Sequence, residues 1–331
     1  MDQPIKIKED VYWIGSLDPG LVIFDIVIPT KHGTTYNSYL VRGEKIAVID
    51  TVKAYCVDDF ISKIRSLVRP EDIDYIIINH TEPDHSGGLI RLMELAPKAI
   101  PVFSRGARTF VKNILHKEFD YKEVKDGDSI DLGGKVLKFI SAPFLHWPDT
   151  MFTYLETDKI LFPCDAFGAH YCSDKRFNDE LDSKEDAFSA YEFYYDTILR
   201  PFKKHVMSAL DNIKDIDIEI IAPSHGPILR ENLEKYIDAY REWSGKTKKY
   251  PDKKKIAIIY VSAYGSTKRM AESIYRGACL PGTDVSLLNA AEIDMETLLD
   301  EIDTSDEIIL GTPTLNAKAP KPIFDIISSL V

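Results

Sequence analysis

Four side chains that can bind a metal ion lie within one six-residue segment of the sequence. They are His80, Glu82, Asp84 and His85. The segment directly follows the apolar residues 75–78, which are typical of a buried strand and too few for a helix. Pro83 argues against a regular helix or central strand here. Gly87 and Gly88 allow the chain to turn before the next helix begins. We therefore expect these ligands on a rigid loop at the carboxyl end of a strand.

Three further candidate ligands follow or nearly follow predicted strands elsewhere in the chain: His146, Asp165 and His225. Taken singly, a histidine or aspartate in a loop is more often a helix cap, a turn former or a solvated charge. Taken together, three carboxylates and four imidazoles at one rim of a sheet would cost several kcal/mol through desolvation and repulsion without a cation. The set of seven predicts a polynuclear metal site.

The donor types indicate which metals suit such a site. Imidazoles and carboxylates without a thiolate favour first-row divalent ions such as Fe, Mn or Zn. Seven ligands exceed what one tetrahedral zinc needs, whereas two metals that share a bridging carboxylate fit the number. The four cysteines form no C-x-x-C pair, so we expect reduced structural thiols at Cys56, Cys164, Cys172 and Cys279.

The elements that must position these ligands alternate between strands and helices. Apolar runs bounded by turn residues predict strands at 11–14, 22–28, 38–41, 45–49, 75–78, 100–103, 135–140, 151–155, 160–163 and 218–222. Helical spacing predicts helices at 57–68, 89–95, 107–115, 183–199 and from 201 to about 213. The first strands are expected to pair antiparallel. The predicted strands fall into two groups along the chain. Two sheets with helices on their outer faces form an αββα sandwich, which is the fold we expect.

A second unit is predicted beyond Trp243. Residues 244–255 hold six lysines in twelve positions and are interpreted as a solvated linker. A fully apolar strand at 256–261 then leads into a hydroxyl-rich turn and a helix with Met270, Ile274 and Ala278 on one face. A helix amino terminus after such a turn is suited to bind phosphate, although neither the P-loop nor the G-x-G-x-x-G spacing is present. Further strands are predicted at 284–288 and 307–310.

The charge of the chain argues against nucleic acids and anionic membranes as partners. Its 53 acidic and 41 basic residues give a formal net charge of −12, which repels phosphates. The amino terminus has no signal-peptide core, and no apolar run approaches the roughly 20 residues of a membrane helix. We expect a cytoplasmic protein without membrane or nucleic-acid contacts.

The order of ligands resembles the metallo-β-lactamase superfamily, with H-x-E-x-D-H followed by a distant His, an Asp and a final His. Glu82 in place of the usual second histidine, together with residues 145–149 (LHWPD), is similar to the flavodiiron proteins, and the resemblance covers essentially the whole chain. By this resemblance, His80, Glu82 and His146 hold one iron ion. The other iron ion takes Asp84, His85 and His225, and Asp165 bridges the two.

The second unit resembles a flavodoxin, whose S/T-x-x-G-x-T loop binds the phosphate of FMN. The resemblance implies FMN contacts from two loops: Ser262, Ala263, Tyr264, Gly265, Ser266, Thr267, Pro313, Thr314, Leu315 and Asn316. It divides the chain into a diiron domain at 1–249 and the N-terminal half of a flavodoxin-like domain at 250–331. The residues after 256 make up only about half of a domain of roughly 150 residues. We therefore expect strands four and five of the sheet to be missing, which weakens the retention of FMN.

The resemblance implies an oxidoreductase that reduces O2 to water, NO to N2O, or both, with electrons passed from FMN. It also implies a head-to-tail homodimer or a dimer of dimers, and rubredoxin or a flavin reductase as the electron donor. Trp147, His170 and Tyr195 are candidate neighbours of the metal ligands, and Tyr194 is a further candidate. The alternative role for these aromatic residues is packing in the core.

Two other functions remain open at this stage. A dinuclear hydrolase of the glyoxalase II or metallo-β-lactamase type would use metal-bound hydroxide, but Glu82 and the flavodoxin-like tail count against it. An oxygen sensor or electron-transfer module would use the same cofactors without turnover. Metal and flavin analysis distinguishes the hydrolase, and oxygen consumption distinguishes the sensor.

Overall fold

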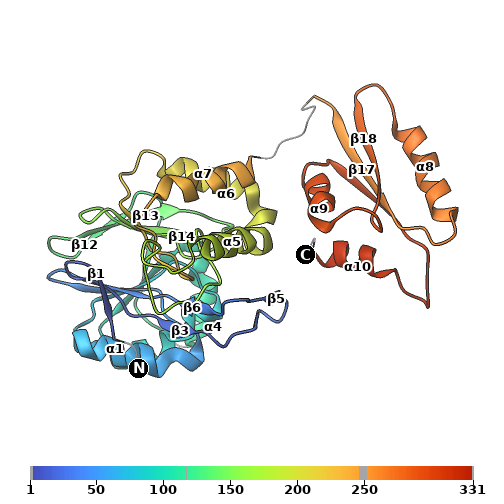
Figure 1. Cartoon of the computed structure of the whole chain (residues 1–331). Helices are drawn as coiled ribbons and strands as arrows, with labels where there is room; N and C mark the ends of the chain where they lie inside the picture. Colours follow the sequence, from blue (N-terminus) through green and yellow to red (C-terminus); the bar gives the residue numbers. More distant parts are fainter. Residues whose placement is uncertain (1–2, 117, 246–251, 330–331) are drawn as a thin grey trace. The chain divides into compact units, whose positions relative to one another are not determined.

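The computed structural model describes residues 3–116, 118–245 and 252–329 of the chain. The chain divides into two compact units, Met1–Ser244 and Gly245–Val331 (Figure 1). The predicted domain boundary between residues 249 and 250, and half of the predicted lysine-rich linker, lie outside the described residues. The two units are therefore considered one at a time.

The first unit is built on two sheets. The larger one is antiparallel from β1 to β8 and parallel from β8 to β11. Its strands, in sheet order, are β1 (Ile5–Lys8), β2 (Val11–Trp13), β7 (Tyr39–Arg42), β8 (Ile46–Ile49), β9 (Tyr75–Ile78), β10 (Ile100–Ser104) and β11 (Lys122–Val124). Short turns join β1 to β2 and β7 to β8 and leave no room for crossover helices, which agrees with the antiparallel pairing of these strands.

The second sheet carries the ligands from the later part of the unit. Its strands are β12 (Ser129–Asp131), β13 (Val136–Ser141), β14 (Met151–Leu155), β15 (Ile160–Phe162) and β16 (Ile220–Ile221). All neighbours are antiparallel except β15 and β16, which run parallel. Two small ribbons complete the strands, β3 (Ser16–Asp18) with β6 (Thr34–Tyr36) and β4 (Ile23–Phe24) with β5 (Ile28–Pro29).

Helices cover the outer face of each sheet (Figure 1). Those against the larger sheet are α1 (Val57–Leu67), α3 (Leu89–Leu95) and α4 (Arg108–Leu115). Those against the second sheet are α5 (Lys184–Tyr194), α6 (Lys203–Ile213) and α7 (Leu233–Ser244). A separate apolar core fills the space between the sheets. Ile76 points to the helices and Ile77 to the inner core, as the two-residue period of a strand requires. The predicted αββα sandwich is confirmed.

The second unit is a parallel sheet between two helical layers. Its sheet order is β18 (Thr283–Asn289), β17 (Lys254–Tyr260) and β19 (Glu307–Gly311). The helix α8 (Ser266–Ala278) packs on one face, and α9 (Met295–Asp303) and α10 (Lys321–Ser328) pack on the other. This is the order 2-1-3 that the flavodoxin-like prediction required.

Two local expectations were wrong. Pro83 does not prevent a helix but begins one, α2 (Pro83–Ser86), because the first helical residue needs no N–H. Residues 22–28 form the hairpin of β4 and β5, not one strand, since Asp25 and Ile26 adopt positive φ. The helix predicted at 183–199 is confirmed in extent, as α5 followed directly by a π-helical turn, Tyr195–Leu199.

The buried face of α8 also differs from the expected one. Met270 and Ile274 are exposed, whereas Ala271 is buried and Tyr275 and Ala278 pack with it against the sheet. The apolar spacing was correct, but two faces of the helix carry apolar residues, so the spacing alone did not select the buried one.

No helix within the described ranges is both long and apolar enough to cross a membrane.

Candidate dinuclear metal centre

The candidate ligands meet at one edge of the two sheets. His80 follows β9, and Asp84 and His85 lie in α2 directly after it. Asp165 and His225 follow the parallel strands β15 and β16. His146 precedes β14, whose start lies beside the end of β15 because the two run antiparallel. Strand direction thus brings ligands from four separate segments to the same place.

The first group of ligands surrounds the carboxylate of Glu82. Its Oε2 lies 3.0 Å from His146 Nε2 and 3.2 Å from His80 Nε2. Asp165 Oδ2 lies 3.7 Å from His80 Nε2 and 3.8 Å from His146 Nε2. Ligand atoms about 2.1 Å from a common ion are separated by about 3 to 3.5 Å, so these four side chains have the spacing of a metal site.

The second group uses the other oxygen of the same aspartate. Asp165 Oδ1 lies 3.1 Å from His85 Nε2 and 3.5 Å from His225 Nε2. Asp84 completes the group, with Oδ2 at 3.1 Å from His225 Nε2 and Oδ1 at 3.4 Å from His85 Nε2. The two oxygens of Asp165 therefore face two different groups of ligands, which is the arrangement of a bridging carboxylate.

Several of these atoms are buried and have no hydrogen-bond partner among the described residues. They are both carboxylate oxygens of Asp84, Oδ2 of Asp165, and Nε2 of His85 and of His225. Unpaired buried polar atoms are rare in folded proteins because each one costs free energy. One metal ion at each of the two groups would satisfy these atoms, so the residues present fit a dinuclear site.

Neighbouring groups orient the imidazoles. His80 Nδ1 lies 3.2 Å from both carboxylate oxygens of Asp149, which also accepts hydrogen bonds from the backbone N–H and hydroxyl of Thr81. His225 Nδ1 lies 2.6 Å from the carbonyl oxygen of Thr35, to which it can only donate. In both histidines a fixed acceptor holds the proton on Nδ1, so Nε2 is the nitrogen left to bind a metal ion, as in other histidine metal sites.

The carboxylates of the centre favour positive charge on their neighbours. Burial opposes a charge on His80, but Asp149 and Glu82 outweigh burial and raise the pKa of His80 to about 10. Burial likewise opposes ionisation of Asp165, yet the nearby imidazoles, His85 first, hold the pKa of Asp165 well below its usual range. Imidazoles bind metals only when deprotonated, so metal ions and protons compete for the same nitrogen atoms.

The residues predicted to lie beside the metal ligands differ in their contacts. Trp147 lies edge-on to His80 at 5.1 Å between ring centroids, and His170 lies 5.5 Å from His225. The hydroxyl of Tyr195 pairs with that of Ser244 at 2.8 Å, and its ring packs with Tyr240. The hydroxyl of the adjacent Tyr194 donates to Asp165 Oδ1 at 2.9 Å, so this tyrosine contacts the centre.

Two carboxylates near the centre received no role from the sequence. Asp149 lies in the LHWPD segment, three residues after His146, and that adjacency was the available signal. Asp25 sits at the turn between β4 and β5, and its carboxyl has a pKa raised to about 6 by burial and by Glu82 and Asp84. No local sequence pattern predicts that Asp25 lies near the centre, because only folding brings the hairpin to this place.

The two predicted flavin loops leave neighbouring strands of the second unit. Residues 262–267 follow β17 and residues 312–316 follow β19, which pairs with β17. Gly265 adopts a left-handed conformation with φ of 83° and caps α8, while its N–H donates to the hydroxyl of Ser262. Backbone N–H groups and hydroxyls at a helix amino terminus suit a phosphate, so this donor set fits FMN.

Comparisons with known proteins agree with both units. Residues 34–226 match the ODP family beta lactamase, and residues 258–321 match Flavodoxin. The chain is 43% identical over 336 residues to Flavo-diiron protein FprA2 of Clostridium acetobutylicum, spanning 98% of this chain and 82% of that protein. It is 36% identical over 335 residues to the nitric oxide reductase of Moorella thermoacetica, spanning 100% and 83%. The solved rubredoxin oxygen:oxidoreductase of Desulfovibrio gigas is similar with a TM-score of 0.78 and 28% identity, spanning 99% and 82%.

Proposed function

This chain belongs to the flavodiiron proteins, a family of O2 and NO reductases, and from that premise we propose that it works with two iron ions and FMN. The iron ions would be held by His80, Glu82, His146, Asp84, His85 and His225, with Asp165 between them. FMN would pass electrons to them. The products would be water from O2 and N2O from NO.

The observation that carries this proposal is the division of the two oxygens of Asp165 between two groups of ligands. Oδ1 faces His85 and His225, and Oδ2 faces His80 and His146. A single metal ion would leave one of these groups without a cation. Two ions 3.5 to 4 Å apart, roughly the separation in dinuclear enzymes, would occupy both.

The ligand charges favour a redox site over a hydrolase. Glu82, Asp84 and Asp165 bring three negative charges to the two ions, which favours the higher oxidation states that a redox cycle must visit. A zinc hydrolase has no such requirement. The dinuclear hydrolase is therefore the weaker alternative, and the flavodoxin-like second unit supports the same choice.

Iron, when bound here, supplies the change of oxidation state that reduction of O2 or NO requires. The residues of the chain hold and shield it. Asp149 fixes the ring of His80, and the hydroxyl of Tyr194 donates to the shared carboxylate of Asp165. Three of the ligands are buried: His80, Asp84 and Asp165. Bulk water is therefore excluded from the side of the centre that they form. Both reductions consume protons, and Asp25 is an exposed acid that interacts with Glu82.

A head-to-tail dimer would bring the FMN of one chain to the iron of another. An exposed apolar surface beside the centre supports this proposal, since such surfaces mark interfaces. The hairpin of β4 and β5 exposes Val22, Ile23, Ile26 and Val27, and Asp25 at its turn faces Glu82.

Rubredoxin is the donor that we propose, with a flavin reductase as the alternative. The name of the Desulfovibrio gigas relative is the support for this choice.

The proposal is tested by loading the purified chain anaerobically with iron and FMN. We expect about two iron ions per chain. After chemical reduction, stopped-flow mixing with O2 and with NO in turn should show reoxidation of iron, and the faster gas identifies the preferred substrate. Chemical reduction reaches the iron directly, so weak FMN binding does not hide the result. Iron that neither gas reoxidises would contradict the reductase function, and one zinc ion with esterase activity would support the hydrolase.

A further inference from the structure

One short turn of the first unit carries the candidate ligand His225. It comprises residues 223–226 and lies shortly after β16. The ring of His225 is tied to β6, because its Nδ1 lies 2.6 Å from the carbonyl oxygen of Thr35. That contact fixes the ring only if the backbone of the turn is itself held in place. The groups that hold this backbone therefore determine where Nε2 of His225 points.

The side-chain amide of Asn37, between β6 and β7, spans this turn. Its Nδ2 donates to the carbonyl oxygen of Pro223 at 2.8 Å and to that of Gly226 at 2.9 Å. These two carbonyl groups belong to the residues on either side of Ser224 and His225. The backbone N–H of Asn37 also donates to the carbonyl oxygen of Ser224 at 2.8 Å. One residue thus holds three of the four carbonyl groups of the turn.

Trp13 fixes the orientation of the Asn37 amide. The indole N–H of Trp13 donates to Asn37 Oδ1 at 2.8 Å. Because an indole N–H can only donate and a carbonyl oxygen can only accept, the amide oxygen must face Trp13 and the NH2 group must face the turn. Trp13 is fully buried, and Lys63 Nζ lies 5.0 Å from its ring centroid. The amide therefore has one possible orientation and a fixed support.

The position of Asn37 requires this residue type. Its side chain is 1% exposed, and the oxygen and the NH2 group of its amide all have partners. An aspartate would offer no donor to the two carbonyl groups, and a leucine of similar shape would leave every partner unpaired in the interior. The backbone is fitted as closely, since a Cβ on Gly15 would lie 2.7 Å from the Cα of Asn37. A fully satisfied buried amide of this kind makes its surroundings rigid.

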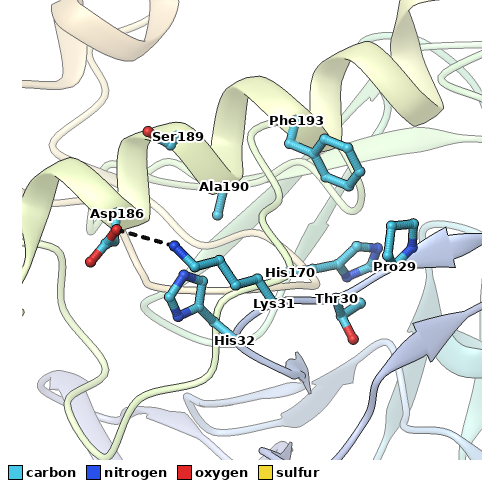
Figure 2. A pocket seen from close by; sticks show the side chains of 9 residues that line it. All are labelled: Pro29, Thr30, Lys31, His32, His170, Asp186, Ser189, Ala190 and Phe193. Atoms are coloured by element: carbon cyan, nitrogen blue, oxygen red, sulfur yellow. Dashed lines mark ion pairs between the residues drawn. The ribbon is translucent and has the colours of Figure 1, made fainter.

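The other contacts of the turn do not replace this amide. Tyr39 Oη donates to the first carbonyl oxygen of the turn at 2.6 Å, and Thr35 Oγ1 accepts from its last N–H at 2.7 Å. The ring of His225 also packs 5.5 Å from that of His170, one of the residues that line a pocket beside α5 (Figure 2). That contact is between rings and holds no backbone atom. Tyr39 and Thr35 each support one end of the turn, whereas Asn37 connects both ends.

We propose that Asn37 is a positioning residue for the metal ion expected in the second group of ligands, the group that contains His225. Its amide sets the distance between the two ends of the turn, and thereby the direction of His225 Nε2. This role rests on the proposed dinuclear centre and extends it to a residue that is not itself a ligand. The first group of ligands has no member in the turn. Loss of the amide should therefore weaken the binding of one ion and leave the other bound.

Two buried asparagines provide a matched pair of variants. Asn37→Ala removes the amide that spans the turn, and Asn178→Ala is the control. Asn178 is 4% exposed, and its amide also binds backbone groups, donating to the carbonyl oxygen of Glu231 at 2.8 Å and accepting from the N–H of Arg230 at 2.9 Å. Residues 230 and 231 are not candidate ligands. Both variants should lose stability in urea, but only Asn37→Ala should lose affinity for a metal ion.

Anaerobic titration of the metal-free full chain with Fe(II), with free iron measured in an ultrafiltrate, gives a dissociation constant for each ion. In Asn37→Ala, one of the two constants should rise by about 10- to 100-fold and the other should stay unchanged. Both constants should be unchanged in Asn178→Ala. After oxidation, an isolated Fe(III) ion gives a high-spin EPR signal that coupling within a pair suppresses. His225→Ala supplies the reference spectrum of a chain without the second ion, and Asn37→Ala at limiting iron should match it.

Every other result counts against the proposed role of Asn37. Two ions bound equally well by the unsubstituted chain and by Asn37→Ala would overturn the role and leave the dinuclear centre intact. Fewer than two ions in the unsubstituted chain would overturn the dinuclear centre and the role with it. An equal loss of affinity in Asn178→Ala would show a general effect of destabilisation, and a spectrum unlike that of His225→Ala would show that the other ion was lost. If thermal unfolding shows that Asn37→Ala is not folded, Asn37→Ser takes its place, because its single hydroxyl cannot bridge both carbonyl groups.

Discussion

The imidazole of His80 lies between two carboxylates. Glu82 approaches its Nε2, and Asp149 approaches its Nδ1. The proposed metal would take the place of the proton at Nε2, while the contact with Asp149 would remain. Asp149 therefore sets both the orientation and the basicity of this ligand, which is the usual role of a carboxylate behind a metal-bound histidine.

The variant Asp149→Asn tests this role at the scale of one residue. It keeps the size of the side chain and removes its charge, so we expect the affinity for iron to fall by about 10- to 100-fold. Titration of the metal-free protein with Fe(II), followed by metal analysis after gel filtration, measures the effect. Asp182→Asn is the control, because Asp182 is 83% exposed and pairs with Lys175 on the surface. Equal iron affinity in the two variants would contradict the role of Asp149.

Tyr194 and Tyr195 are adjacent in sequence but differ in their partners. Tyr194 donates to Asp165 Oδ1, whereas Tyr195 pairs with Ser244 at the end of α7. Removing the donor from Asp165 leaves a more electron-rich carboxylate, which stabilises Fe(III). We therefore expect Tyr194→Phe to lower the midpoint potential of the iron pair in a redox titration.

Tyr195→Phe is the matched control for that variant. It should leave the iron potential unchanged and lower the free energy of unfolding by about 1 kcal/mol, because a buried hydroxyl pair is broken. Urea denaturation measures the loss of stability. A shift of potential in Tyr195→Phe but not in Tyr194→Phe would reverse the assignment of the two tyrosines.

At the scale of elements, the turn after β16 positions His225. Gly226 follows it with φ of 78°, a conformation that residues with a Cβ rarely adopt. A Cβ at this position would lie 2.7 Å from the carbonyl oxygen of Ala169, whose N–H donates to the carbonyl oxygen of His225. The turn and the segment after Asp165 are thus fitted directly against each other.

Gly226→Ala should therefore disturb both stability and metal binding. We expect a loss of about 2 kcal/mol or more in the free energy of unfolding, from backbone strain and from the displaced segment. Iron binding should weaken as well, because His225 moves with the turn. Gly20→Ala is the control, since a Cβ there meets nothing within 4 Å. Similar urea midpoints for the two variants would show that the turn tolerates a side chain.

At the scale of the whole molecule, the proposed function requires electrons to pass between the two units. The metal centre belongs entirely to the unit Met1–Ser244, and the flavin loops belong to the unit Gly245–Val331. Under the proposed head-to-tail pairing, the flavin that serves one centre comes from another chain. The apolar hairpin beside the centre would then be covered by the partner.

Dilution tests this arrangement. With iron and FMN bound and the electron donor in excess, the rate of O2 consumption per chain should be constant at high protein concentration. It should then fall once sedimentation shows that dimers dissociate, because electron transfer between separate chains becomes bimolecular. A rate per chain that stays constant in a monomeric sample would show that each chain serves its own centre.

The sequence by itself determined the donor types and the order of the elements. An apolar strand followed by closely spaced histidines and acids is a local pattern, so His80, Glu82, Asp84 and His85 were recognisable as one group. The two-residue and 3.6-residue periods likewise predicted most strands and helices, because burial imposes those periods on each segment separately. The FMN loops of the second unit were predicted from the resemblance to a flavodoxin.

Only the tertiary structure decided which atoms face one another. Nothing local determines that Oδ1 of Asp165 turns to His85 while Oδ2 turns to His80. The local sequence also does not determine whether Tyr194 or Tyr195 contacts Asp165. Successive helical residues point about 100° apart, and the packing of the helix determines which of them faces the centre. Asp25 reaches Glu82 only because the hairpin folds over the centre. These contacts join residues far apart in the chain, and their geometry is determined by how the two sheets pack.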